Sequence, residues 1–302
     1  MADQGTHGTG QRSETLEIPA GDVTMVADAY GDPSDPPVVL LHGGGQTRHS
    51  WGSTAADLGA KNWYAVTVDL RGHGDSTWSP DGYYGLDRFA ADVIKVADYL
   101  GRPPVYVGAS LGGNSSLAAI SVRPDLALGL VLVDVSPFLQ PAGTSRIRDF
   151  MVSHAETGFA TLEEAADAVA AYVPHRPRPR NLEGLKKNLR HRDGRWYWHW
   201  DPKFMALPTD QAVQRDPLID PARLGAAARD LRTPTLLVRG GESDVLSVDD
   251  AKRFLELVPH AEFASVAGAH HMVAGDDNAV FEDVLDDFLE RRVRSRLKLF
   301  GS

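Results

Sequence analysis

The sequence has no cysteine among its 302 residues. This excludes disulfide bonds, thiolate nucleophiles and zinc or iron–sulfur centres held by cysteine. It also lacks any apolar run near the roughly 20 residues that a membrane-spanning helix needs. The first residues, MADQGTHGTGQRSE, have neither the basic start nor the apolar stretch of a signal peptide. From these absences we expect a cytoplasmic protein with no membrane partner.

Positive charge is in deficit. The chain carries 31 Lys and Arg against 41 Asp and Glu, for a formal net charge of −10. A field of this sign repels nucleic acid, so we expect no nucleic-acid partner. With 42% hydrophobic and 24% charged residues, the composition is that of a packed globular protein. The length fits one large domain or two small ones, and the sequence does not indicate an oligomeric state.

Short apolar, β-branched runs recur between glycines and prolines, and they predict buried strands. The runs are Val38 to Leu41, Tyr64 to Val68, Val105 to Val107, Leu130 to Val133, Thr235 to Val238 and Glu262 to Val266. Helical patterns lie between them, most clearly from Leu86 to Leu100. This alternation predicts an α/β fold with a mostly parallel sheet between helices, and residues 15–19 and 23–29 would add an antiparallel hairpin at one edge.

The alternation stops after Pro137 and resumes near Leu231. We therefore predict an inserted, mainly helical lid over residues 137–227, between core segments 14–136 and 228–302. Residues 1–13 are expected to form a disordered tail. The predicted lid contains a helical stretch over 162–172, a proline and arginine run over 174–180, and an aromatic run over 196–200.

One predicted strand ends in Gly108-Ala109-Ser110-Leu111-Gly112, directly before a helix of small residues. A strand, a sharp turn and a helix form the setting that the G-x-S-x-G pattern requires. The turn exposes the serine hydroxyl above the strand ends, and glycines leave room for it. We therefore predict that Ser110 is a nucleophile.

A serine hydroxyl needs a histidine base and a carboxylate that orients the histidine. Asp244 follows the strand predicted at 235–238, and His270 and His271 follow the strand at 262–266. The oxyanion of the reaction needs two backbone N–H donors. Leu111 can supply one, and the His42 to Gly45 loop can supply the other.

Together these motifs resemble the α/β-hydrolase fold, specifically its lid-bearing serine hydrolases of the esterase, lactonase and haloperoxidase-like group. The landmarks are LLHGGG at 40–45, VDLRGHGDS at 68–76, GASLGG at 108–113, LVLVDVSP at 130–137, GGESDVLS with its preceding glycine, and GAHHMV at 268–273. The resemblance covers nearly everything from about residue 15 onward. It implies Ser110 as nucleophile, Asp244 as orienting acid, and Gly44 and Leu111 as oxyanion donors.

The resemblance leaves choices at several positions. Matching GAHHMV to the family's usual glycine before the base favours His271 as the base and puts His270 in the possible substrate pocket. Asp134 also ends a strand where some α/β-hydrolases carry the acid, so it is the alternative acid. Trp196 and Trp198 are possible pocket residues. An arginine cluster is either a recognition site for an acidic group or a solvated connector; it comprises Arg176, Arg178 and Arg180.

The identity of the predicted nucleophile, Ser110, narrows the range of reactions that the protein could catalyse. Epoxide hydrolases and haloalkane dehalogenases of this fold use an aspartate there, whereas a serine suits acyl transfer from a carboxylic ester, lactone or thioester. We therefore expect a hydrolase of small or medium acyl substrates. The alternatives are a cofactor-free haloperoxidase or perhydrolase, a C–C bond hydrolase, and a ligand sensor that keeps the triad. No P-loop, dinucleotide fingerprint or H-E-x-x-H spacing occurs, so we expect no cofactor and no metal.

Overall fold

A computed structural model describes residues 13–176, 178, 182–205, 218–271 and 279–300. Its centre is a sheet of eight strands in the order β1-β2-β4-β3-β5-β6-β9-β10. The strands are β1 (Glu14–Ala20), β2 (Val23–Tyr30), β3 (Pro37–Leu41), β4 (Tyr64–Val68), β5 (Val105–Ala109), β6 (Gly129–Val133), β9 (Thr235–Gly240) and β10 (Glu262–Val266). The pairs that join β1, β2 and β4 are antiparallel, and all others are parallel.

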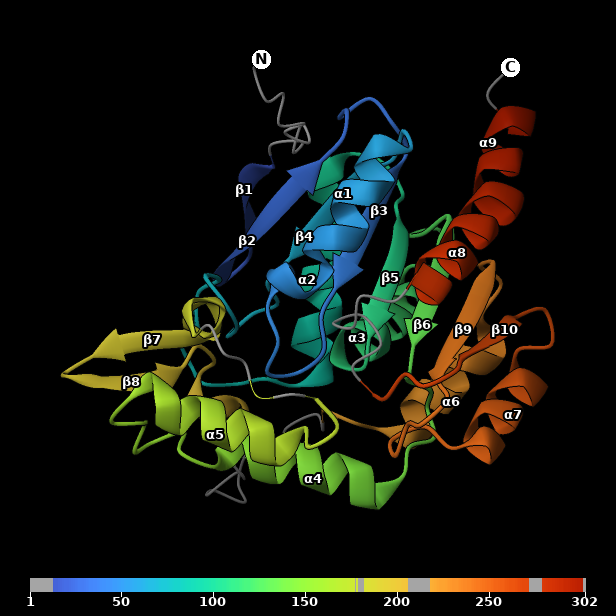
Figure 1. Cartoon of the computed structure of the whole chain (residues 1–302). Coiled ribbons are helices and arrows are strands. Elements are labelled where there is room, and N and C mark those ends of the chain that lie inside the picture. The colour runs from blue at the N-terminus through green and yellow to red at the C-terminus, as the bar shows by residue number, and fades with distance from the viewer. Residues whose placement is uncertain (1–12, 177, 179–181, 206–217, 272–278, 301–302) are drawn as a thin grey trace, which may run out of the picture.

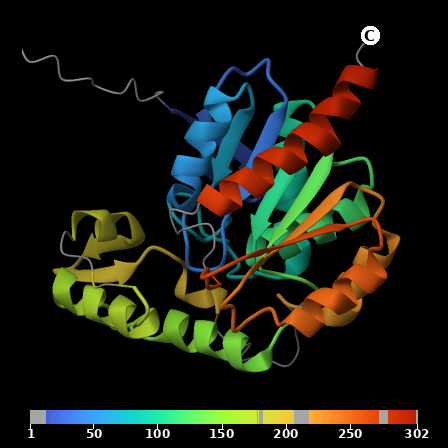
Figure 2. The ribbon, with the colours of Figure 1, turned by 45° about the vertical axis from the view of Figure 1, so that its right-hand side comes forward.

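Helices cover both faces of this sheet, as Figures 1 and 2 show. Apolar side chains of α2 (Leu86–Leu100), α3 (Leu111–Val122), α6 (Pro221–Asp230) and α7 (Val248–Leu257) pack on one face. Those of α1 (Gly52–Ala60) and α8 (Ala279–Phe288) pack on the other. Every residue of β3, β4, β5 and β6 is buried, because a parallel strand between two helical layers has no face in water.

The sequence-based fold class is confirmed. The predicted edge hairpin, the six core strands and the helix over 86–100 are all present, with strand ends that differ by at most two residues. After β10, the described residues form α8, the π-helical stretch η5 (Leu289–Arg294) and α9 (Ser295–Phe300). The predicted tail falls almost wholly on residues 1–12, which lie outside the described residues. Within the described ranges, no helix is long and apolar enough to cross a membrane.

Between β6 and β9 the chain leaves the sheet. This inserted segment, taken as residues 137–227, contains α4 (Pro141–Val152), α5 (Leu162–Tyr172), η2 (Glu183–Asn188), β7 (Leu189–Arg192), β8 (Arg195–Trp198) and η3 (Pro202–Phe204). The predicted aromatic run forms part of an antiparallel hairpin of β7 and β8. Figure 1 shows α4 and α5 lying below the sheet at the end where β5 and β6 finish. The boundaries of the inserted segment at residues 137 and 227, and its role as a lid, stay predictions. Helix α6 starts within it but packs on α3.

Candidate active site

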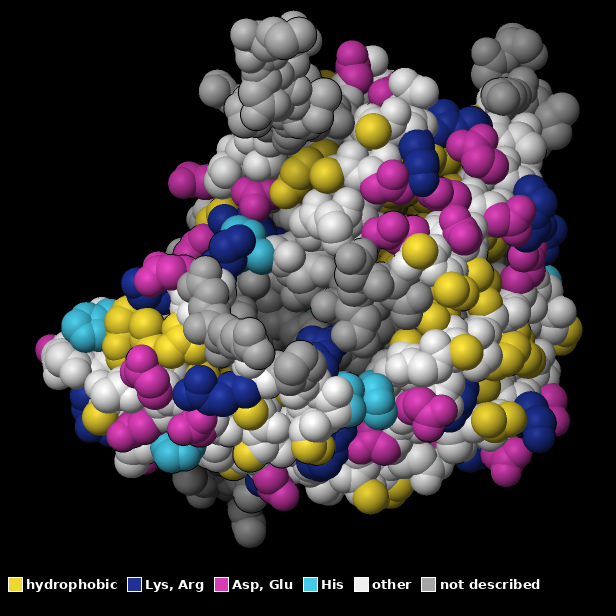
Figure 3. Space-filling view, in the orientation of Figure 1, with side chains coloured by type: hydrophobic (Ala, Val, Ile, Leu, Met, Phe, Trp, Pro, Cys, Tyr) yellow, Lys and Arg dark blue, Asp and Glu magenta, His cyan; other side chains and the backbone are white. Residues whose placement is uncertain are grey.

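A cavity of about 250 Å³ lies between the sheet and the inserted segment. Its described lining comes from the His42 to Gln46 loop, the turn at Ser110, α4, the end of α5, and Trp198, Trp200 and Phe204. Figure 3 shows a hollow on this face, with basic and histidine side chains near its rim. The wall is mainly apolar, and Arg176 is the one permanently charged side chain among the described lining residues. Such a cavity suits a small, largely apolar ligand.

Ser110 lines the cavity and lies on the turn between β5 and α3. Its backbone has φ 45° and ψ −108°, a conformation that non-glycine residues rarely adopt and that is concentrated at functional sites. The flanking glycines are sterically required. A Cβ on Gly108 would lie 2.4 Å from the nitrogen of Gly113 across the bend, and one on Gly112 would lie 2.5 Å from the Leu41 oxygen on β3.

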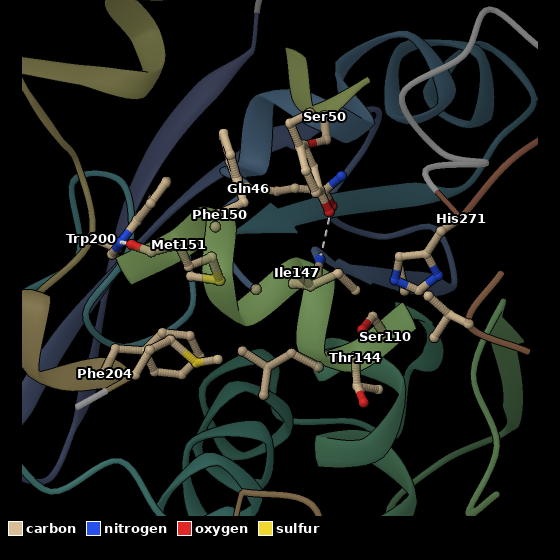
Figure 4. Close-up of a pocket in the computed structure, with 18 of the residues that line it drawn as sticks. Gln46, Ser50, Ser110, Thr144, Ile147, Phe150, Met151, Trp200, Phe204 and His271 are labelled. Carbon is tan, nitrogen blue, oxygen red and sulfur yellow. Dashed lines mark hydrogen bonds between the residues drawn. The ribbon is translucent and has the colours of Figure 1, made fainter. Parts of the chain in front are cut away.

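His271 follows β10 and lines the same cavity, and Figure 4 shows its imidazole facing toward Ser110. Its Nδ1 lies 2.7 Å from Oδ2 of Asp134. Asp134 directly follows β6 and has φ 51°; its side chain is fully buried, whereas the His271 side chain is 11% exposed. A carboxylate accepts hydrogen bonds, so Nδ1 carries the proton and the lone pair of neutral His271 is on Nε2. This is the tautomer that a general base for Ser110 requires.

The structure corrects the preferred acid, because Asp244 does not contact His271. Its carboxylate accepts two hydrogen bonds from Arg146 on α4, at 2.9 Å and 3.1 Å, and its side chain is 49% exposed. The strand ends place both aspartates at the same edge of the sheet, yet only Asp134, the alternative acid, is buried and directed at the imidazole. Asp244 instead connects the core to the inserted segment.

The two residues predicted to supply the oxyanion donors line the same cavity as Ser110. Within the described part of the chain, the N–H groups of Gly44 and Leu111 have no hydrogen-bond partner. Leu111 is the first residue of the twelve-residue helix α3, where the helix dipole favours negative charge. Two residues of the cavity that holds the serine thus have backbone N–H groups available as donors.

Gln46 holds the glycine loop in shape. Its side-chain Oε1 accepts a hydrogen bond from the backbone N–H of Gly43 at 2.9 Å, which Figure 4 draws as a dashed line. The backbone N–H of Gln46 donates to the backbone oxygen of Gly43 at 3.1 Å. His42 supports the loop from below. Its Nε2 accepts the N–H of Leu70 at 3.0 Å, so its Nδ1 carries the proton and donates to the Gly43 oxygen.

Three buried histidines lie behind this loop. Burial lowers the pKa of His42 to about 4 and that of His73 to about 3, and it lowers the pKa of His199 well below its usual value. His199, from the inserted segment, accepts the Gly74 N–H at 2.7 Å and donates to the Gly45 oxygen at 3.3 Å. All three therefore act as neutral hydrogen-bonding groups. Among the described residues, no three or more His, Asp or Glu side chains are arranged so that they could hold a metal ion.

Only some of the predicted pocket residues line the cavity. Trp198 lines the cavity, but Trp196 does not, and its ring packs on His191 instead. His270 does not line the cavity either; its ring stacks on His175 with centroids 3.5 Å apart. Arg178 pairs with Asp167 at 2.6 Å, and Arg180 lies outside the described residues.

Sequence reasoning also missed several residues that shape the site. Ser243 contacts the Asp134 carboxylate, and Gln46 fixes the glycine loop. Ser243 lies inside the GGESDVLS motif, where the adjacent aspartate drew attention. Its role depends on a contact over 109 residues of sequence, which no local pattern reveals.

Fold and cavity together define a hydrolase of the α/β type. The model of the Alpha/beta hydrolase family matches residues 38–284, and the chain belongs to this family. It is similar to the esterase Rv0045c of Mycobacterium tuberculosis, with 31% identity over 266 residues that cover 86% of this chain and 84% of the relative. A solved structure of that esterase superposes with a TM-score of 0.72 at 28% identity, covering 92% of each chain.

Two further comparisons agree on the fold. The mouse sn-1-specific diacylglycerol lipase ABHD11 is 29% identical over 86% of this chain and 82% of its own. The crystal structure of E-2-(acetamidomethylene)succinate hydrolase superposes with a TM-score of 0.77, covering 92% of this chain and all of that one, at 23% identity. The chain is therefore a hydrolase, with relatives that carry the names of esterases and lipases.

Proposed function

We propose that the protein is a serine hydrolase of small or medium, largely apolar acyl substrates, with carboxylic esters as the first class to test and lactones and thioesters beside them. Ser110 is the nucleophile, His271 the base, Asp134 the orienting acid, and the N–H groups of Gly44 and Leu111 bind the oxyanion. The observation that carries this proposal is the 2.7 Å contact between Asp134 and His271, at a cavity shared with the strained Ser110.

The reaction follows from these positions. Ser110 Oγ attacks the acyl carbon and passes its proton to Nε2 of His271, while the two N–H groups stabilise the negative oxygen. His271 returns the proton to the departing alcohol, which leaves an acyl ester on Ser110. A water molecule then gives its proton to His271, attacks the ester and releases the acid with the free serine. Asp134 keeps His271 in the tautomer that this cycle needs.

The inserted segment supplies the specificity in this proposal. We propose that residues 137–227 form a lid, since α4, the end of α5 and Trp198 to Phe204 make most of the apolar wall. A wall of this kind favours an acyl chain over a charged group. The cytoplasmic location expected from the sequence stays a prediction.

The test is covalent labelling. Incubation with a fluorophosphonate, followed by intact-protein mass measurement, is expected to give one adduct on the wild type and none on Ser110→Ala. A panel of p-nitrophenyl esters of increasing acyl length then measures steady turnover, which a ligand sensor would lack. A wild type with neither adduct nor turnover would overturn the proposal.

A further inference from the structure

Ser243 lies in the loop after β9, and its side chain contacts the carboxylate that orients His271. Its Oγ is 2.5 Å from Oδ2 of Asp134. The N–H groups of Val245 and Leu246 each donate to the same Oγ at 3.1 Å. The hydroxyl therefore joins the turn at 243–246 to the acid of the site.

The direction of the hydrogen bonds follows from these partners. A serine hydroxyl has one proton and two lone pairs, and the two backbone N–H groups occupy the lone pairs. The proton is left for Oδ2 of Asp134, the oxygen that also accepts the proton on His271 Nδ1. The other carboxylate oxygen, Oδ1, accepts the Gly240 N–H at 2.9 Å. Three donors thus hold the buried carboxylate from three directions.

We propose that Ser243 is a positioning residue that fixes the Asp134 carboxylate in the orientation that His271 needs. The proposal rests on the function proposed above, since it assigns a role in the same reaction. It also gives the loop after β9 a function in the site: this loop contributes a hydroxyl from residue 243 rather than the carboxylate of Asp244. Without that donor, Oδ2 is held by His271 alone, and the imidazole can turn away from Ser110 together with its partner.

A purely structural role is the competing explanation, because the same hydroxyl accepts two backbone N–H groups. Ser247, four residues further on, provides a matched control. Its Oγ accepts the Asp250 N–H at 3.1 Å and donates to the Asp250 carboxylate at 2.6 Å, but it does not contact Asp134 or His271. Ser247→Ala removes a turn hydroxyl of the same kind from the same loop.

The first measurement separates kcat from KM on a p-nitrophenyl ester that the wild type turns over. Ser243→Ala is expected to lower kcat about tenfold, as loss of a hydrogen bond to a charged group does, with KM changed less than about twofold. Ser243→Thr keeps the hydroxyl and should recover most of kcat. Ser247→Ala should leave both constants within about twofold of the wild type.

The second measurement is a double-mutant cycle with Asp134→Asn. If Ser243 acts through the carboxylate, adding Ser243→Ala to Asp134→Asn should cost less than about twofold instead of tenfold. The rate at which a fluorophosphonate labels Ser110 is the readout for variants that turn over too slowly. Equal losses in the two backgrounds, or an equal loss in Ser247→Ala, would show a structural role and overturn the proposal.

Failure of the proposed function looks different. In that case the wild type itself shows no Ser110-dependent labelling or turnover, which overturns both proposals before the cycle is measured. A wild type that labels and turns over, beside an unchanged Ser243→Ala, overturns the positioning role alone.

Discussion

At the scale of single residues, two aspartates compete for one role. Asp134 and Asp244 follow the neighbouring parallel strands β6 and β9, whose carboxyl ends meet at one edge of the sheet. Asp134 is buried against His271, whereas Asp244 is half-exposed and paired with Arg146. An exposed ion pair contributes little free energy, while a buried carboxylate beside the base fixes its tautomer.

Asparagine substitutions test this assignment. Asp134→Asn is expected to lower kcat for ester hydrolysis by about 10³ to 10⁴, because the amide no longer selects the Nδ1–H tautomer of His271. Asp244→Asn is the matched control and should change kcat by less than about threefold, because it weakens only an exposed contact. Steady-state kinetics on one p-nitrophenyl ester measures both. A severe loss in Asp244→Asn beside a mild one in Asp134→Asn would reverse the assignment.

At the scale of elements, α4 is packed closely on the core. A Cβ on Gly143 would lie 2.4 Å from the backbone oxygen of Asp244, so a glycine is needed for this approach. Thr144 and Ile147, which follow Gly143 in the same helix, line the cavity. The position of α4 therefore determines the shape of the acyl pocket.

Two glycine-to-alanine changes in helices separate packing from helix propensity. Gly143→Ala must push α4 away from the loop at Asp244, and we expect KM to rise about fivefold or more while fluorophosphonate labelling of Ser110 persists. Gly225→Ala in α6 has open space around its Cβ and should raise the free energy of unfolding by up to about 1 kcal/mol. Ester kinetics and thermal melts measure the two effects. An unchanged KM in Gly143→Ala would contradict close packing.

At the scale of the whole molecule, the buried histidines couple stability to pH. The pKa of His42 lies at about 4 and that of His73 at about 3, both because of burial, against an unfolded value near 6.5. Between these values the unfolded chain binds more protons than the folded one, so stability falls as the pH falls below about 6.5. At pH 5, each of these two histidines costs about 2 kcal/mol of folding free energy.

Thermal melts between pH 7.5 and pH 5.0 measure this coupling. We expect the melting temperature to fall across this range. His73→Asn should melt lower at pH 7.5 but lose less on acidification, because one of the groups responsible is gone. His191→Asn, an exposed histidine in β7, should leave the pH dependence unchanged. Parallel curves for His73→Asn and the wild type would contradict the assignment.

Much of the fold was predictable because its signals are local. The runs at Val38 to Leu41 and at Leu130 to Val133 are fully buried in a parallel sheet, and strands of this kind consist of consecutive apolar residues. The turn around Ser110 was predictable for the same reason. A serine in this strained conformation needs glycines two residues before and after it, and the five consecutive residues from Gly108 to Gly112 show this pattern.

The sequence by itself determined the α/β class, the strand order along the chain, the elbow at Ser110 and the glycine loop beside it. Only the tertiary structure decided which aspartate meets His271, which rings line the cavity, and that Ser243 contacts Asp134. The physical reason is distance along the chain. The contact of His271 with Asp134 spans 137 residues, and its geometry depends on how β6, β9 and β10 align in the sheet. Asp134 and Asp244 both follow strand ends, and only their burial and direction in three dimensions distinguish them.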